Sequence, residues 1–252
     1  MLKAKVAIVT GSTGGIGEGI AQALAAEGAA VIVSGRRIEE GEQVVAKIQA
    51  KGGTAEFVQA DIAREYDCFA LIRTCKVHFG QVDILVNNAG IFPSTPLTDV
   101  TAAQWDEVFA TNVRGAFLCS QAVIPAFKRR GGGVIINIGS TLVNRGMGDR
   151  IAYACSKGAL LTMTKVLARE LLPLQIRVNW VTVGWVATPG EVELRNQTHG
   201  NGQAYLDQMS SRMPLGRLET VEDIAAGVVY LASDAASHIT GCELNISGGL
   251  WI

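Results

Sequence analysis

The stretch KVAIVTGSTGGIGEGIAQALAAEG, from Lys5 to Gly28, joins a β-branched run to a segment of helical period through a glycine-rich turn. Gly11, Gly15 and Gly17 permit a tight turn and a close approach of the backbone to a diphosphate. The helix start that follows supplies unpaired N–H groups and the positive end of a dipole. Because glycine-rich turns also serve plain packing, it is the order strand, turn, helix that favours a dinucleotide-binding site.

Short β-branched runs alternate with helical segments along most of the chain, which is typical of βα units on a parallel sheet. No internal repeat, low-complexity tract or linker interrupts the series. The chain is therefore expected to form an α/β structure, a single-domain doubly wound Rossmann fold over residues 1–252 with a seven-stranded parallel sheet flanked by helices. Strands are expected over residues 5–10, 29–35, 54–60, 83–89, 133–139, 176–183 and 242–247, and helices over 17–28, 37–53 and 102–130.

Residues 185–218 interrupt this alternation. The stretch mixes Pro189, Gly200 and Pro214 with Tyr205, Met209 and Met213, and this composition predicts a long irregular insertion. Open α/β sheets bind ligands at the carboxyl ends of their strands, so the insertion is expected to cover the substrate as a lid. A variable surface excursion is the alternative.

The overall charge of the chain is close to zero, with 22 basic and 23 acidic residues. This balance argues against a nucleic-acid groove or a membrane-surface patch. No apolar run approaches the roughly 20 residues of a membrane span, and the amino terminus has too short an apolar run for a signal peptide, so a cytoplasmic protein is expected. Five cysteines without a CxxC pair and three histidines without ligand spacing predict no metal site.

Further motifs follow the glycine-rich turn in a fixed order. They are Asp61-Ile62, Asn87-Asn88-Ala89-Gly90, Asn112, Ser140, and YACSK from Tyr153 to Lys157. Together with TGSTGGIG, they match the order and spacing of the classical short-chain dehydrogenase/reductase family over nearly the whole chain, and the sequence resembles that family. The resemblance implies a nicotinamide dinucleotide cofactor, a small-molecule carbonyl or alcohol substrate, and a homotetramer.

The resemblance also implies roles for individual residues at the cofactor. Asp61 would bind the adenine amino group, with Ile62 packed nearby, and Asn88-Ala89-Gly90 would shape the wall beside the adenosine ribose. Val186 and Thr188 match positions that contact the carboxamide and the phosphates. The cofactor-binding residues predicted in this way are Gly11, Ser12, Thr13, Gly15, Ile16, Gly17, Ser34, Arg36, Arg37, Asp61, Ile62, Asn88, Ala89, Gly90, Tyr153, Lys157, Val186 and Thr188.

Tyr153 and Lys157 are one helical turn apart and would share a helix face. A nearby ammonium favours the phenolate, as does a nicotinamide cation in the oxidised complex, so the pKa of Tyr153 is expected to fall from about 10 toward 7. Taken alone, such a pair is usually a surface pair. The resemblance assigns Lys157 also to the nicotinamide ribose, Ser140 to the substrate oxygen, and Asn112 to a water in a proton relay. The predicted catalytic residues are Asn112, Ser140, Tyr153 and Lys157, and the predicted substrate-binding residues are Ser140, Tyr153 and Trp185.

Two positions depart from the family pattern. Val183-Gly184 stands where the family commonly has Pro-Gly, so a loop that proline would stiffen is left without that constraint. Ser247-Gly248-Gly249 stands where Asp-Gly-Gly is common, a change to which the sequence assigns no function.

The end of the second predicted strand, VIVSGRR, bears on the choice between NADP(H) and NAD(H). NAD-preferring relatives place an acidic residue at the position of Gly35, where it accepts from the ribose 2′-OH. Here glycine is followed by Arg36 and Arg37, and a guanidinium suits a 2′-phosphate. NADP(H) is favoured, while a charged start to a surface helix is the alternative.

These observations predict an NADP(H)-dependent oxidoreductase that interconverts a ketone and a secondary alcohol, a carbonyl reductase type. An NAD-dependent alcohol dehydrogenase of the same family is one alternative. A non-catalytic dinucleotide-binding regulator is another, and the complete set of Ser140, Tyr153, Lys157 and Asn112 argues against it. The sequence does not identify the ketone or alcohol.

Overall fold

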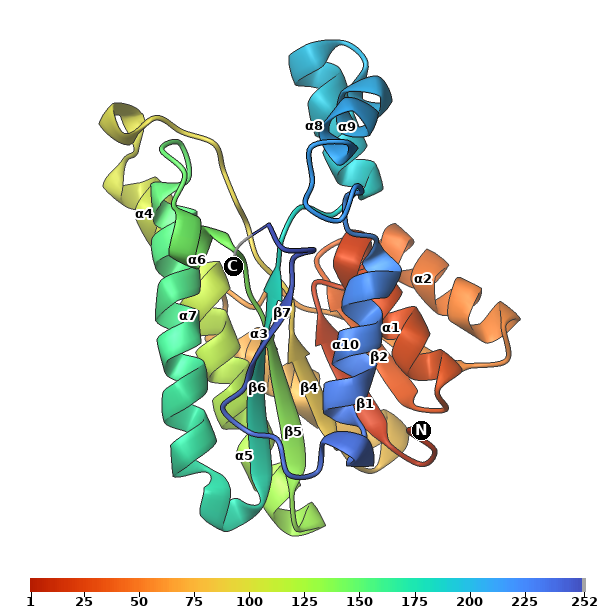
Figure 1. Ribbon diagram of the computed structural model, residues 1–252. Helices are drawn as coiled ribbons and strands as arrows, with labels where there is room; N and C mark the ends of the chain where they lie inside the picture. The colour runs from red at the N-terminus through yellow and green to blue at the C-terminus, as the bar shows by residue number, and fades with distance from the viewer. Residues whose placement is uncertain (251–252) are drawn as a thin grey trace.

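A computed structural model describes residues 1–250 (Figure 1). Its centre is one sheet of seven parallel strands in the order β3-β2-β1-β4-β5-β6-β7. The prediction of a seven-stranded parallel sheet flanked by helices is confirmed, and every predicted strand is present within two residues of its expected bounds. The strands are β1 (Val6–Thr10), β2 (Ala30–Gly35), β3 (Thr54–Gln59), β4 (Ile84–Asn87), β5 (Gly133–Ile138), β6 (Ile176–Val183) and β7 (Glu243–Ile246).

The strand order reverses between β1 and β4, which pair directly. In doubly wound sheets, a crevice opens at such a reversal beyond the carboxyl ends of the strands. The glycine-rich turn after β1 and the turn after β4 therefore meet at this edge of the sheet.

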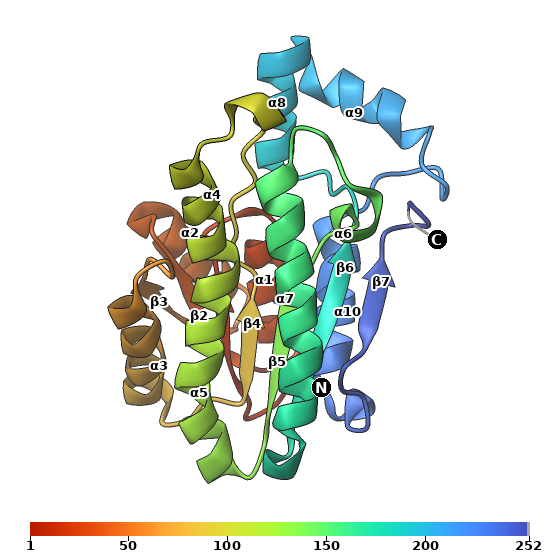
Figure 2. The ribbon, with the colours of Figure 1, turned by 90° about the vertical axis from the view of Figure 1, so that its left-hand side faces the viewer.

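Helices cover both faces of the sheet. On one face α1 (Gly15–Ala26), α2 (Ile38–Ala50) and α10 (Val221–Ala232) enclose an apolar core with β-branched residues of the strands. On the other face lie α3 (Glu65–Phe79), α5 (Ala116–Arg130) and α7 (Ile151–Glu170), as Figure 2 shows. The continuous apolar runs of the five inner strands follow from this arrangement, because these strands are buried on both sides, whereas the edge strands β3 and β7 are partly exposed.

The helix predicted over residues 102–130 is divided by a π-helical segment. α4 (Ala102–Phe109) passes into η2 (Ala110–Gly115) and then into α5 without a break in the chain direction. Asn112 and Gly115 are the buried residues of this segment. Such segments are rare and often occur at functional sites. The shorter elements are α6 (Leu142–Arg145) and the 3-10 turns η1 (Leu97–Asp99), η3 (Leu172–Leu174) and η4 (Asp234–Ala236).

The prediction of an irregular insertion over residues 185–218 is wrong, because much of it is helical. α8 (Pro189–His199) and α9 (Gly202–Ser210) project beyond the carboxyl edge of the sheet (Figure 1). The side chains of Thr188 and Asn201 cap their first turns. The proline and glycines stand at helix boundaries, where they are compatible with helix.

Candidate active site

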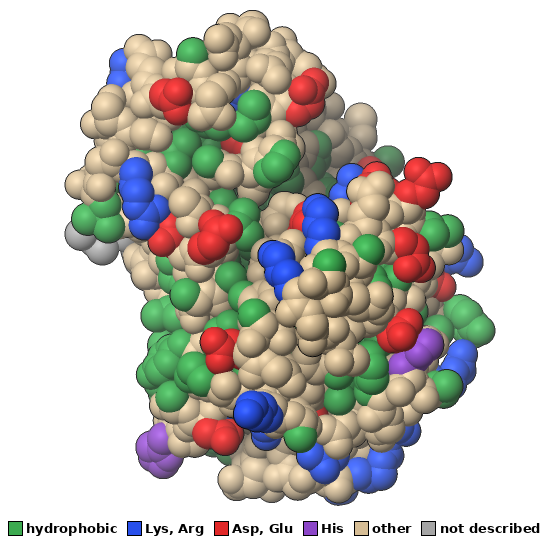
Figure 3. Space-filling model, turned by 90° about the vertical axis from the view of Figure 1, so that its right-hand side faces the viewer, with side chains coloured by type: hydrophobic (Ala, Val, Ile, Leu, Met, Phe, Trp, Pro, Cys, Tyr) green, Lys and Arg blue, Asp and Glu red, His purple; other side chains and the backbone are tan. Residues whose placement is uncertain are grey.

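A cavity of about 830 Å³ lies at the carboxyl ends of the strands, between the glycine-rich turn and the α8–α9 pair. The space-filling view shows this side of the molecule hollowed beneath the projecting α8–α9 pair (Figure 3). Most of the predicted site residues meet there, although they come from seven separate parts of the chain. Those that line it are Gly11, Thr13, Gly15, Ile16, Gly17, Arg36, Arg37, Asp61, Ile62, Asn88, Ala89, Gly90, Ser140, Tyr153, Lys157, Trp185, Val186 and Thr188.

The glycine-rich turn is tightly packed against the turn that follows β4. Gly11 has a φ of +64°, and a Cβ there would lie 2.7 Å from the Cα of Ala89. The Nδ2 group of Asn88 donates to the carbonyl oxygens of Thr10 and Gly11 at 2.9 and 3.0 Å. Asn88 therefore fixes the shape of the turn, and only glycine fits at position 11.

Ser12 and Ser34 lie behind the turn and not on the cavity wall. Ser12 is fully buried, and its hydroxyl donates to the carbonyl of Val9 and accepts from the N–H of Ser34. Ser34 is 1% exposed. Ser12 and Ser34 were predicted to contact the cofactor, but the structure places them behind the turn, where they support the carboxyl ends of β1 and β2.

The two arginines after β2 differ in their surroundings. Arg37 lies against the glycine-rich turn, where its Nη2 donates to the Oγ1 and the carbonyl oxygen of Thr13 at 3.0 and 3.2 Å. It also pairs with Glu40 at 3.4 Å. Arg36 is exposed at the cavity rim. A Cβ at Gly35 would lie 2.7 Å from Cγ2 of Thr13, so a larger side chain there must displace the turn.

Tyr153, in the first turn of α7, faces Ser140 at the end of β5. Burial raises the pKa of Tyr153, while a hydrogen bond with Ser140 and the charge of Arg150 act in the opposite direction. The prediction that Lys157 lowers this pKa is wrong for the protein alone. Desolvation of the phenolate is the dominant effect, so Tyr153 holds its proton at neutral pH.

Lys157 is 4% exposed and lies under the tyrosine ring, with its Nζ 5.7 Å from the ring centroid. The ammonium donates to the carbonyl oxygen of Ile138 at 2.7 Å. Burial lowers the pKa of Lys157 to about 8. The lysine is therefore held by the backbone of β5, one turn below the tyrosine, and can exchange a proton near neutral pH.

Asn112 is fully buried in η2 and lies outside the cavity lining. Its Oδ1 accepts from the N–H of Ile91, and its Nδ2 donates to the carbonyl of Ile91 and to the Oγ of Ser156. The amide thus joins the loop after β4 to α7. Asn112 therefore supports the cavity from outside its lining, by hydrogen bonds that link these two segments.

The α8–α9 pair closes the substrate side with stacked rings and an arginine. Nε1 of Trp185 donates to Glu191 at 2.8 Å, and Glu191 pairs with Arg195 at 2.7 Å. The Arg195 guanidinium lies 5.4 and 5.7 Å from the ring centroids of Trp185 and Tyr205. His199 stacks on Tyr205 with a centroid distance of 3.9 Å. Trp185 was predicted at the substrate, and it forms part of this wall.

Arg150 and Asp149 line the cavity beside Tyr153, although the sequence motifs do not include them. Arg150 donates to the carbonyl oxygen of Phe92, and Asp149 accepts from the hydroxyl of Ser94. The backbone N–H of Thr95 also donates to the carbonyl of Asp149 at 2.9 Å. Both residues precede the tyrosine in GDRIAY, but only the fold brings residues 92–95 to them.

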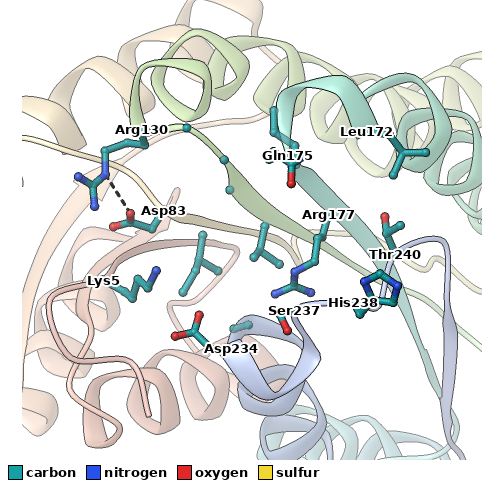
Figure 4. A pocket seen from close by; sticks show the side chains of 17 residues that line it. Lys5, Asp83, Arg130, Leu172, Gln175, Arg177, Asp234, Ser237, His238 and Thr240 are labelled. Atoms are coloured by element: carbon teal, nitrogen blue, oxygen red, sulfur yellow. Dashed lines mark hydrogen bonds and ion pairs between the residues drawn. The ribbon is translucent and has the colours of Figure 1, made fainter.

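A second cavity, of about 600 Å³, lies at the opposite end of the sheet (Figure 4). Arg130 pairs with Asp83 at 3.2 Å, and Arg177 donates to two backbone carbonyls with Asp234 nearby. The turn at Gly131, Gly132 and Gly133 also lines this cavity, but its lining includes no tyrosine and it lies at the amino ends of β4, β5 and β6. The chemistry therefore concentrates in the first cavity.

Within residues 1–250, no helix combines the length and the hydropathy needed to cross a bilayer. The same residues contain no group of three or more His, Cys, Asp or Glu side chains arranged to hold a metal ion.

The reversal point of the sheet, the glycine-rich turn and the Tyr153–Lys157 pair share one cavity, and this combination defines a dinucleotide-dependent oxidoreductase. Residues 11–251 match the family model described as enoyl-(acyl carrier protein) reductase. The chain belongs to the classical short-chain dehydrogenase/reductase family, whose members use a nicotinamide dinucleotide.

Individual relatives extend over nearly the full chain. An uncharacterized oxidoreductase of Methylorubrum extorquens is 41% identical over 254 residues, covering 99% of this chain and 98% of the relative. The 3-oxoacyl-acyl-carrier-protein reductase FabG of Staphylococcus epidermidis is 37% identical, with coverage of 98% and 99%. A crystal structure of a Sinorhizobium meliloti protein described as a short-chain alcohol dehydrogenase superposes with a TM-score of 0.91 at 35% identity, covering 98% of this chain and 96% of that one.

Proposed function

We propose that the protein is an NADP(H)-dependent reductase that interconverts a ketone and a secondary alcohol. The observation that carries the proposal is the hydrogen-bonded pair of Ser140 and Tyr153, above Lys157, in the cavity that begins at the glycine-rich turn. When bound, the cofactor supplies the hydride.

The residues of this chain would handle the proton and the substrate oxygen. The hydroxyls of Ser140 and Tyr153 can both donate to a carbonyl oxygen, which polarises it. Tyr153 then releases its proton to that oxygen as negative charge develops, and its raised pKa keeps the phenol protonated until it is needed. Lys157, with a pKa of about 8, can replace the proton from below.

The cavity residues fit the two ends of a dinucleotide. Asp61 and Ile62 would take the adenosine half and Val186 and Thr188 the nicotinamide half, as the family resemblance implies, and all four residues line the cavity. The first helix supplies its amino terminus to the space between them, where a diphosphate would be stabilised. A small-molecule substrate would enter between Tyr153 and the α8–α9 pair, and assembly into a homotetramer is part of the proposal.

A substrate panel tests the proposal directly. NADPH oxidation would be followed with aromatic ketones, aliphatic ketones and 3-oxoacyl thioesters, the last because a relative is named for that substrate class. Ketone-dependent oxidation of NADPH is the expected result. Tight dinucleotide binding without turnover on any member of the panel would favour a non-catalytic regulator, and a higher kcat/KM with NADH would favour an NAD-dependent dehydrogenase.

Replacing each arginine after β2 tests the cofactor preference. Arg36→Ala and Arg37→Ala each remove a charged donor, worth roughly 1.5–3 kcal/mol against a phosphate. NADPH binding should weaken about ten- to a hundredfold in each variant, with NADH binding little changed. Arg73→Ala, an exposed arginine on α3, is the matched control. An unchanged NADPH/NADH ratio in both variants would contradict the phosphate assignment.

The α8–α9 pair is expected to respond to ligands. Its helices project from the body and bury few side chains, so local opening should be easy. Amide hydrogen exchange over residues 189–210 should slow several-fold when NADP⁺ and an alcohol are added together. Equal exchange in the free and bound protein would mean that the pair is a fixed wall.

A further inference from the structure

The five residues after β6 form an extended strap along the cavity. Residues 184–188 include Trp185, Val186 and Thr188, all of which line the cavity, and Val186 and Thr188 match family positions that contact the carboxamide and the phosphates. A single bridge between Val186 and Glu219 is the strap's only pairing with another extended segment within residues 1–250. Something other than a sheet ladder must therefore hold it.

Glu219 supplies that support through both its backbone and its side chain. Its N–H donates to the carbonyl of Trp185 at 3.1 Å, and its carbonyl accepts from the N–H of Ala187 at 3.0 Å. Its carboxylate Oε2 accepts from the N–H of Gly184 at 2.8 Å, and the N–H of Trp185 bonds to the carboxylate as well. The N–H groups of Gly184, Trp185 and Ala187 and the carbonyl of Trp185 thus converge on one residue.

The carboxylate is buried, which is unusual for a group outside the reacting centre. Glu219 is 6% exposed, and burial raises its pKa while the two backbone N–H groups oppose that rise. Arg217 and Asp223 act on it with opposite signs. A Cβ on Gly184 would collide with the carboxylate, so only glycine at position 184 leaves room for the buried Glu219 side chain.

The sequence around the strap explains why a carboxylate is useful there. Val183 stands where proline would fix the backbone φ angle, so the chain that leads into the strap lacks that constraint. A carboxylate that accepts from two consecutive N–H groups holds the strap in one conformation, because charge-assisted hydrogen bonds are stronger than neutral ones.

We infer that Glu219 is a positioning residue that fixes the 184–188 strap, and with it the nicotinamide half of the cofactor site, without touching the reacting atoms. The inference rests on the proposed function for the identity of the ligand. It assigns no role to Glu219 at the adenine half, which is built by other elements.

Two ligands distinguish the nicotinamide half of the cofactor site from its adenine half. NADP⁺ requires both, whereas adenosine 2′,5′-bisphosphate occupies only the adenine half. Glu219→Ala removes both side-chain acceptors, so NADP⁺ should bind about tenfold more weakly while the fragment's affinity stays within about twofold. Glu219→Gln keeps one acceptor oxygen and should recover most of the NADP⁺ affinity. Amide exchange over residues 184–188 should accelerate in the alanine variant and to a smaller extent in the glutamine variant. Glu222→Ala, at an exposed carboxylate on α10, is the control.

Each outcome decides the inference. Wild-type NADP⁺ affinity and wild-type exchange in Glu219→Ala would overturn it, as would an equal loss of affinity for NADP⁺ and the fragment. If the alanine variant does not fold, the glutamine variant decides by the same two measurements. If the wild-type protein binds no dinucleotide, the proposed function fails, and exchange over residues 184–188 alone then supports or overturns the role of Glu219.

Discussion

Tyr153→Phe should lower ketone reduction by at least about a hundredfold, the scale of general acid–base catalysis. The variant keeps the ring, its edge contact with Phe92 at 6.0 Å and the position of Lys157 beneath it, and loses only the hydroxyl. The measurement is kcat with saturating ketone and NADPH. Because the hydroxyl moves a proton, cofactor affinity should barely change.

Tyr66→Phe is the matched control, since Tyr66 is 71% exposed on α3. It should have wild-type kcat. Near-normal turnover in Tyr153→Phe would reject the proton-transfer role, and a large loss in both variants would indicate a general effect of the substitution on folding.

Lys157→Met should reduce both turnover and cofactor affinity, by about tenfold or more each, because one ammonium is assigned two tasks. The methionine has a similar length and stays apolar in a buried position, so the loss of charge is the main change. Titration with NADP⁺ and kcat measurements give the two quantities separately. Unchanged NADP⁺ binding would show that the ribose contact is wrongly assigned, and Lys76→Met on the surface of α3 is the control.

The same substitution has a predictable effect on stability. The pKa of Lys157 falls from 10.5 in the unfolded chain to about 8 when folded, so between these values the unfolded state binds more protons. The free energy of unfolding should therefore rise with pH across pH 8 to 10.5, by about 3 kcal/mol from this group, and below pH 8 the cost of burying the charge is present in full. Urea unfolding at several pH values should find this component in the wild type and not in Lys157→Met.

The strands were predictable because each one carries a plain signal. Runs such as VAIVT at β1 and GVIINI at β5 are buried on both sides, so nearly every residue is apolar and the bounds are sharp. The glycine-rich turn was equally clear, since Gly11 is required by its φ and by the approach of Ala89.

Some features that escaped prediction carry local signals, and others depend on partners distant in the chain. Residues 189–210 contain proline and glycine, but Thr188 and Asn201 cap their helices, and those caps are local signals that could have been used. The π-helical turn at Asn112 has nearly the same apolar period as an α-helix. The buried carboxylate of Glu219 was invisible, because the N–H groups it binds are 35 residues away.

For the protein alone, the pKa of Tyr153 shifts in the direction opposite to the prediction, which relied on the charges of Lys157 and of a bound nicotinamide cation. The sequence shows a lysine one turn away, but not that the phenol is desolvated or that the ammonium bonds to Ile138. Burial depends on the assembled cavity, and here it outweighs the charge.

The α8–α9 pair runs from Pro189 to Ser210, and its rings and Arg195 contact one another and Trp185, which precedes the pair. We expect such a unit, together with Trp185, to be exchangeable for the corresponding segment of a relative, because the sheet, the glycine-rich turn and the tyrosine come from other segments. Over evolutionary time, the substrate wall could then diversify by recombination while the redox chemistry stayed constant. For the engineer, the same two boundaries mark where a chimera should be joined.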